Sequence, residues 1–230
     1  MLKIDKWLSS QLGYSAYNID NTGLKNFNFF KYKSKNILIS IKSNKKIKNL
    51  FLKKNQIKLI EKNITFLKNP KKKKVEINYF KNIRLANIFD KKAILDIAEN
   101  SFIKSRFYKD KNIKKRLARK IKRNWVLNFF RKKRGEHLIV SEVNKKVVGF
   151  LLILKNQKDY IIDLIAVKKI YQNLGLGTKM IEFLENKILK QNKVKIYVST
   201  QSDNKDSIKL YIKNKFKVKY KKYVYHFNGY

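Results

Sequence analysis

The segment Gln172-Asn173-Leu174-Gly175-Leu176-Gly177 contains two of the seven glycines in the chain. It lies between a strand-like run that ends at Val167 and a helical pattern that begins near Gly177. Glycines at such a junction let the backbone approach a ligand closely, and the free N–H groups and the positive end of the helix dipole bind anions. The segment therefore predicts a loop that holds a diphosphate, with a tight turn that binds nothing as the alternative.

Two common phosphate-binding patterns do not fit this loop. The Walker pattern requires Gly-Lys-Ser/Thr, whereas the order here is Gly177-Thr178-Lys179. The dinucleotide pattern requires a third glycine where Met180 stands. The elements around the loop must therefore identify its ligand.

Residues 82–230 show an order of apolar patterns that predicts β-α-α-β-β-β-α-β-α-β. Three strand-like runs have short connections and predict an antiparallel meander. The helix predicted over 112–133 carries apolar residues at every fourth position, typical of an amphipathic helix. The predicted strands are 83–87, 137–143, 146–154, 160–167, 194–200 and 216–227, and the predicted helices are 90–102, 112–133, 177–190 and 204–215.

The single proline, Pro70, lies in a lysine-rich stretch without apolar residues and predicts a boundary. Before it, strand patterns at 36–41 and 56–67 flank a short helical pattern at 44–54. We therefore expect residues 1–80 to form a small N-terminal α+β module and residues 82–230 to form a second domain.

Composition excludes several classes of protein and site. The chain has no cysteine and only two histidines, which excludes disulfide scaffolds and thiol nucleophiles and leaves too few ligands for a His-rich metal site. No metal is expected. The longest apolar run, 147–154, is far shorter than the ~20 residues of a membrane span, so we expect a cytoplasmic protein without membrane insertion.

The net charge is +41, from 57 Lys and Arg against 16 Asp and Glu. Fifty of the basic residues are Lys, and they are spread along the chain, with the densest runs at Lys71–Lys74 and Arg131–Arg134. Selected phosphate recognition favours Arg, so this pattern indicates a solvated surface and no dedicated nucleic-acid face. Such a field would also steer small polyanionic substrates towards the protein.

Several segments of residues 82–230 together resemble the Gcn5-related N-acetyltransferase (GNAT) superfamily. They are Ile83-Arg-Leu-Ala-Asn-Ile-Phe-Asp90, Asp163-Leu-Ile-Ala-Val167, the 172–177 loop, and Asn204 followed seven residues later by Tyr211. The resemblance implies an α/β (α+β) GNAT fold, with a central mixed, mostly antiparallel sheet flanked by helices. It also implies an N-acetyltransferase that takes acetyl-CoA as co-substrate.

The resemblance further implies roles for individual residues. The strand before the loop would splay from its neighbour, so that backbone of Ile165, Ala166 and Val167 contacts the acyl and pantetheine groups. Asn204 would hydrogen-bond the cofactor, and Tyr211 would be the general acid for the departing thiolate. The residues that would grip the pyrophosphate are Gln172, Asn173, Leu174, Gly175, Leu176, Gly177 and Thr178.

The chemistry of Tyr211 is compatible with this role, because a positioned phenol of pKa ~10 can protonate, or at least stabilise by a hydrogen bond, a thiolate whose thiol has a pKa of ~8.5. A buried amphipathic ring without a catalytic role is the alternative. No carboxylate lies on the strand that precedes Asn204. Asp163 and Glu142 are candidates for the general base, or ordinary paired charges, and the base stays unassigned.

The whole chain is similar to the dTDP-fucosamine acetyltransferase group in the segments 7–14, 105–108 and 198–212. This implies transfer to the amine of a nucleotide-linked 4-amino-6-deoxyhexose, with Arg106 near the phosphates or, equally, in a surface or helix-capping ion pair. A homodimer is a candidate assembly. The alternatives are a ribosomal-protein N-acetyltransferase and a non-catalytic nucleic-acid binder that retains the fold.

Overall fold

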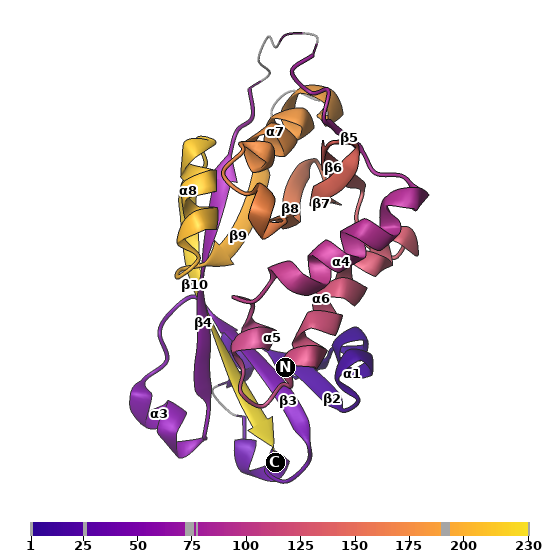
Figure 1. The fold of residues 1–230 in the computed structure, drawn as a ribbon. Coiled ribbons are helices and arrows are strands. Elements are labelled where there is room, and N and C mark those ends of the chain that lie inside the picture. Colours follow the sequence, from indigo (N-terminus) through magenta and orange to yellow (C-terminus); the bar gives the residue numbers. More distant parts are fainter. Residues whose placement is uncertain (1, 25–26, 72–75, 77, 190–193, 230) are drawn as a thin grey trace.

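The computed structural model describes residues 2–24, 27–71, 76, 78–189 and 194–229. In these residues one ten-stranded sheet has the order β1-β2-β3-β10-β4-β9-β8-β7-β6-β5 (Figure 1). The strands are β1 (Lys3–Ile4), β2 (Ser15–Ile19), β3 (Ile37–Ser43), β4 (Lys58–Lys68), β5 (Ile83–Leu85), β6 (His137–Val143), β7 (Lys146–Asn156), β8 (Asp159–Val167), β9 (Ile196–Gln201) and β10 (Lys217–Gly229).

Only the β2–β3 and β8–β9 neighbours in this sheet are parallel, and the other described pairs are antiparallel. The expectation of a mixed, mostly antiparallel sheet flanked by helices is therefore confirmed. The helices are α1 (Lys6–Leu12), α2 (Asn21–Leu24), α3 (Asn49–Lys54), α4 (Lys91–Ser101), α5 (Arg106–Lys109), α6 (Lys115–Phe130), α7 (Leu176–Phe183) and α8 (Lys205–Lys213).

The C-terminal strand β10 lies between two strands of the N-terminal part of the chain. It pairs with β3 on one side and with β4 on the other, and in Figure 1 the long strands β4 and β10 run alongside each other. On its far edge β4 pairs with β9, where Asn63 lies opposite Gln201. Residues before Pro70 and residues after 82 thus share one continuous sheet, and the proposed division near residue 80 crosses it.

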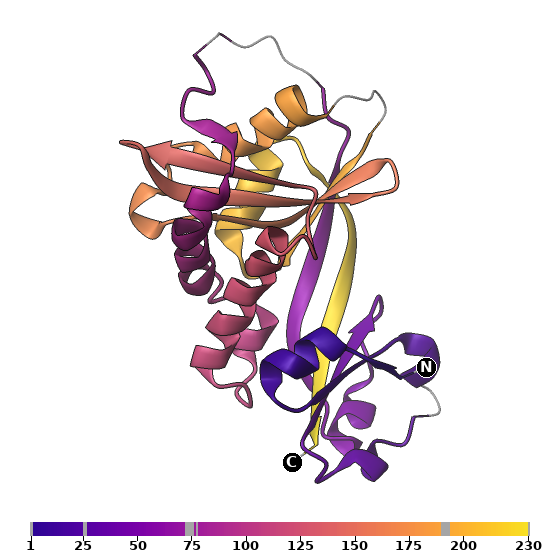
Figure 2. The same ribbon diagram turned by 90° about the vertical axis from the view of Figure 1, so that its right-hand side faces the viewer.

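Helices cover the two faces of the sheet with separate apolar clusters. On one face, α7 and α8 pack over β4, β8 and β9 through residues such as Met180, Ile181 and Phe66. On the other face, α4 and α6 pack over β6, β7 and β8 through Ile94, Val126 and their neighbours, as Figure 2 shows from the side. The sheet is thus covered on both faces beside β8 and β9.

The order of elements predicted for residues 82–230 is observed with one addition, the short helix α5 between α4 and α6, and the meander β6-β7-β8 is confirmed. The long helix is shorter than predicted, because the chain before its first residue, Lys115, forms a separate turn in which the Asn112 and Ile113 N–H groups donate to Asp110. The helix predicted over 177–190 divides into α7 and a π-helical turn, Leu184–Ile188, and Lys190 lies outside the described residues, as do Lys72–Lys74.

Candidate active site

β8 and β9 pair over only three residues and then separate. Their parallel pairing runs from Tyr160 opposite Ile196 to Ile162 opposite Val198. Beyond it, β8 continues to Val167 on the side of β7, while β9 continues to Gln201 on the side of β4. The backbone edges that face each other across this gap, including Ile165 and Ala166 on β8, therefore have no partner strand.

The loop after β8 has the geometry predicted for an anion site. Asn173 and Gly175 have positive φ values of 65° and 74°, and Gly175 is the N-cap of α7 without a side-chain cap. The first backbone hydrogen bond of the helix is donated by Lys179 to Gly175 over 3.0 Å. The N–H groups of the preceding turn, residues 176–178, thus have no intrahelical acceptor and lie at the positive end of the helix dipole.

Other residues of the loop make hydrogen bonds or packing contacts with neighbouring elements of the protein. The Gln172 amide donates to the Val167 carbonyl over 3.0 Å and so fixes the loop to the end of β8. A Cβ on Gly177 would approach the Leu210 side chain to 3.2 Å, so this glycine lets α7 and α8 pack closely. Asn214 donates to the Thr178 hydroxyl over 3.1 Å, which joins the same two helices.

Tyr211 lies on α8 and is 2% exposed. Its ring packs against Phe66 of β4 and Phe216, with centroid distances of 5.6 and 5.7 Å. Burial raises the pKa of Tyr211 above its ordinary value, so the phenol is protonated at neutral pH. No described residue forms a hydrogen bond with its hydroxyl, which leaves that proton available to a ligand.

Asn204 caps the start of α8 and lies close to the end of β9. Its amide donates to the hydroxyls of Thr200 and Ser207 over 3.2 and 2.8 Å. The amide hydrogens thus serve local structure, and the cofactor contact predicted for Asn204 stays a prediction.

The two candidate bases are both held in ion pairs. Asp163 accepts from the Arg134 guanidinium at 2.7 and 2.8 Å and from the Trp125 indole at 2.9 Å. Glu142 pairs with Arg84, which also binds Asp90. Of the two interpretations, the structure therefore favours paired charges.

Arg106 begins α5 and points into the protein. Its guanidinium donates to the buried Ser40 hydroxyl of β3 over 2.5 Å and lies 4.6 Å from the centroid of the Phe107 ring. None of the ion pairs among the described residues includes it, so the surface ion pair considered for Arg106 is not observed. Desolvation by the surrounding protein lowers its pKa, while the charges of Glu61 and Asp5 raise it.

Lys122 on α6 is, like Arg106, a partly buried cation. Its ammonium group lies 4.4 Å from the Trp125 ring centroid and 5.3 Å from that of Phe102, and within the described part of the chain it has no ion-pair partner. Desolvation lowers the pKa of Lys122 to about 8, against the opposing charges of Asp163 and Glu61. Two half-buried, unpaired cations thus lie on the sheet face opposite Tyr211.

Sequence reasoning missed Lys122 and Glu61. Lys122 is one lysine among fifty on a predicted amphipathic helix, so nothing distinguished it. Glu61 is the only acidic residue between Asp20 and Glu76, and it falls within a predicted strand. That isolation was a usable signal.

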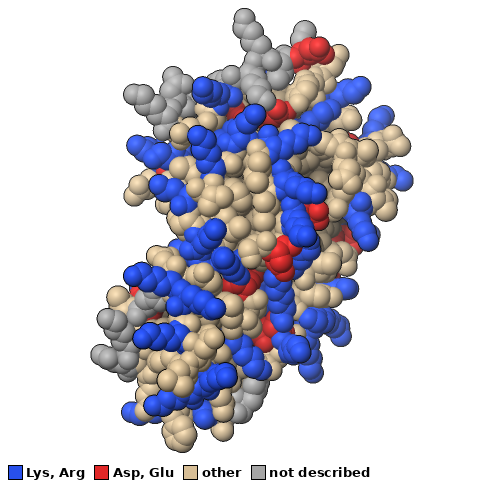
Figure 3. All heavy atoms as spheres, turned by 90° about the vertical axis from the view of Figure 1, so that its left-hand side faces the viewer, with Lys and Arg blue, Asp and Glu red and all other residues tan. Residues whose placement is uncertain are grey.

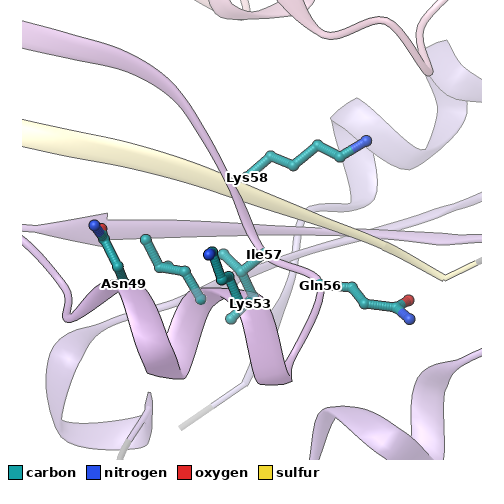
Figure 4. Close-up of a pocket in the computed structure, with 6 residues that line it drawn as sticks. Asn49, Lys53, Gln56, Ile57 and Lys58 are labelled. Carbon is teal, nitrogen blue, oxygen red and sulfur yellow. The ribbon is translucent and has the colours of Figure 1, made fainter.

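Two surface hollows lie elsewhere. One is lined by α3 and the start of β4, including Asn49, Leu52 and Lys58 (Figure 4), and the other by Asp20, Lys42 and Lys222 with two neighbours. Neither contains a predicted site residue. Lys and Arg are spread over the face drawn in Figure 3, with a few Asp and Glu between them, as expected for a generally basic surface.

Two negative findings apply to the described residues alone. No helix there combines the length and apolar character that crossing a membrane requires. No group of three or more His, Asp or Glu side chains there could hold a metal ion.

A 28% identical relative is the spore coat polysaccharide biosynthesis protein SpsD of Bacillus subtilis, matched over 137 residues, 60% of this chain. The match spans 47% of the length of SpsD, about half of that relative.

Solved structures match over a larger part of the fold. A protein of unknown function from Staphylococcus epidermidis has a TM-score of 0.61 at 14% identity, covering 84% of this chain and 73% of its own. An acetyltransferase of the GNAT family from Novosphingobium aromaticivorans has a TM-score of 0.56 at 8% identity, with coverages of 84% and 75%. These likenesses establish the fold.

The family comparison covers the segment that carries the loop and the separated strands. The model of the acetyltransferase (GNAT) family matches residues 96–216, more than half of the chain. The matched residues include the 172–177 loop and Tyr211. The chain therefore belongs to the acetyltransferase (GNAT) family.

Proposed function

We propose that this acetyltransferase transfers the acetyl group of acetyl-CoA to the amine of a nucleotide-linked amino sugar, a 4-amino-6-deoxyhexose. The observation that carries the proposal is the gap between β8 and β9, which has free backbone N–H groups of the turn before α7 at one end. The sheet beside the gap has the buried Tyr211 phenol on one face and the cations Arg106 and Lys122 on the other. GNAT acetyltransferases use acetyl-CoA, and the residues around the gap fit it.

The cofactor would lie along the gap with its pyrophosphate at the start of α7. Free N–H groups of residues 176–178 suit the phosphate oxygens. The unpaired backbone edge of β8 at Ile165 and Ala166 suits the amide-rich pantetheine arm, because both offer donors and acceptors. Bound there, acetyl-CoA supplies the thioester that the amine attacks.

Tyr211 would supply the proton to the departing thiolate. Its phenol is protonated at neutral pH and has no hydrogen-bond acceptor among the described residues. When the amine nitrogen forms its bond to the acetyl carbon and the C–S bond breaks, the sulfur takes this proton. The tyrosinate then recovers a proton from the nitrogen or from water.

The acceptor would approach from the face covered by α5 and α6. The unpaired cations Arg106 and Lys122 on that face suit a diphosphate, since charge-assisted hydrogen bonds to phosphate oxygens are strong. The similarity to SpsD, a polysaccharide biosynthesis protein, supports a sugar-related acceptor. An acceptor that carries phosphates and an amine satisfies both observations.

The test is release of free thiol from acetyl-CoA with dTDP- and UDP-linked 4-amino-6-deoxyhexoses, with the corresponding hydroxy sugars as controls. We expect release with an amino sugar and none with its hydroxy counterpart. Release only with a peptide from a ribosomal protein would contradict the sugar acceptor. Failure to bind acetyl-CoA would contradict the proposed site.

A further inference from the structure

Glu61 on β4 is a buried carboxylate with one unused oxygen. The side chain is 6% exposed, and its Oε1 accepts from the Asn63 amide over 3.0 Å. Its Oε2 is buried without any hydrogen-bond partner. An unsatisfied buried oxygen of this kind destabilises the protein, so its position calls for a ligand that donates to it.

Four neighbouring elements present positive or titratable groups to Glu61. Across the sheet, Val224 of β10 lies opposite both Glu61 of β4 and Lys42 of β3. The Arg106 guanidinium is bound to Ser40 of β3, which lies opposite His226. Desolvation lowers the pKa of each of the four groups, and the charge of Glu61 opposes that shift. These groups are Lys42 of β3, Arg106 of α5, Lys122 of α6 and His226 of β10.

These groups do not neutralise Glu61 directly. No described ion pair within 4.0 Å joins Glu61 to any of them, and His226 is bound by Asp110 at 2.6 Å. The buried His226 Nε2 also has no partner. Elsewhere in the protein the buried Glu185 and Asp90 have their cations in contact. The cationic groups thus lie near the Glu61 carboxylate without forming a described ion pair with it.

Glu61 also lies on the face of the sheet from which the acceptor would approach. Along β4, Ile64 and Phe66 point to the cluster that contains Tyr211, so Glu61, Asn63 and Thr65 lie on the opposite face. Thr65 is hydrogen-bonded to Ser199 of β9 over 2.8 Å, beside the gap. The side chains of Glu61, Asn63 and Thr65 therefore follow one face of β4 towards the β8–β9 gap, where the thioester would lie.

We propose that Glu61 binds the amine of the acceptor and takes the proton that the amine must lose. The inference rests on the proposed function and names a residue of that site. The acceptor ammonium donates to Oε2, one N–H bond breaks, and its proton forms the O–H bond of a neutral carboxylic acid. The free amine then attacks the acetyl carbon, CoA leaves as the thiol, and Glu61 returns its proton to water.

The test compares Glu61→Gln with Glu61→Asp and with a control on the surface, Glu136→Gln, in the full chain. The probe is dTDP-4-amino-4,6-dideoxygalactose, and thiol release is measured from pH 5.5 to 9.5. Thermal unfolding and acetyl-CoA binding are measured in parallel, so that a misfolded variant is recognised. Glu61→Asp keeps the carboxylate if Glu61→Gln fails to fold.

We expect Glu61→Gln to lower kcat/KM for the acceptor at least 50-fold at pH 7, with acetyl-CoA affinity within twofold of the wild type. Its rate should follow the titration of the acceptor amine itself, while Glu61→Asp keeps the wild-type pH profile at reduced rate. Glu136→Gln should match the wild type.

Wild-type transfer together with an unchanged pH profile and kcat/KM in Glu61→Gln would overturn the role of Glu61 and leave the proposed function standing. Equal losses in acceptor and acetyl-CoA affinity would overturn it too, because that result indicates a structural role. Absence of transfer by the wild type to this sugar would overturn both proposals.

Discussion

The two faces of β4 carry side chains of opposite chemistry. Ile64 and Phe66 point into an apolar cluster with Tyr211, whereas Glu61, Asn63 and Thr65 lie among polar and charged groups. Both sets belong to one strand beside the β8–β9 gap. The alternation of side chains along a strand thus separates an apolar environment around Tyr211 from a polar and charged environment on the opposite face.

The largest effect should come from truncating the apolar face. Phe66→Ala removes a fully buried ring and is expected to lower the free energy of unfolding by about 3–5 kcal/mol. Thr65→Ala, one residue away on the polar face, should cost only about 1 kcal/mol, the value of one hydrogen bond. Urea denaturation measures both, and equal losses would refute the difference between the faces.

Tyr211→Phe keeps the ring and removes the proton donor. We expect at least a tenfold lower kcat, or about 1.4 kcal/mol in the activation free energy, with little change in acetyl-CoA affinity. Steady-state kinetics with thiol detection measures the change. Tyr160→Phe, in a residue packed against the same cluster, is the matched control. Full turnover in Tyr211→Phe would remove this phenol from the mechanism.

Arg106→Gln tests the polar face. Loss of a charge-assisted hydrogen bond of about 1.5 kcal/mol should raise the KM for the nucleotide sugar about tenfold and leave the KM for acetyl-CoA unchanged. Arg116→Gln removes the same charge from the exposed surface of α6 and controls for the general field. A similar rise in KM in both variants would indicate steering by net charge instead of a local contact.

A pH dependence of stability should come from Lys122. Its folded pKa of about 8 lies below the ordinary value of 10.5, so between these pH values the unfolded state binds a proton that the folded state lacks. Stability should therefore rise with pH across this window. Lys122→Met should lose this rise in the free energy of unfolding, whereas the exposed control Lys120→Met should keep it. Denaturation at pH 7.5 and at pH 9.5 compares the two variants.

Local patterns were sufficient for much of this molecule. Short connections predicted β6-β7-β8, and the glycine pair predicted the turn before α7. The placement of β4 beside β9 depends on pairing between distant segments, which no local period records, and Glu61 was therefore assigned to a separate module. Ion pairs such as Asp163 with Arg134 also arise only when the fold brings distant residues together.

The insertion of β10 between β3 and β4 also has a consequence for biosynthesis. As the chain is made, β3 and β4 emerge early, but the strand that satisfies an edge of each follows all the other strands of the sheet. During translation those edges are exposed, and exposed edges recruit other strands. Folding of this enzyme should therefore be slow to complete and sensitive to nascent-chain concentration, and holding chaperones should improve its yield.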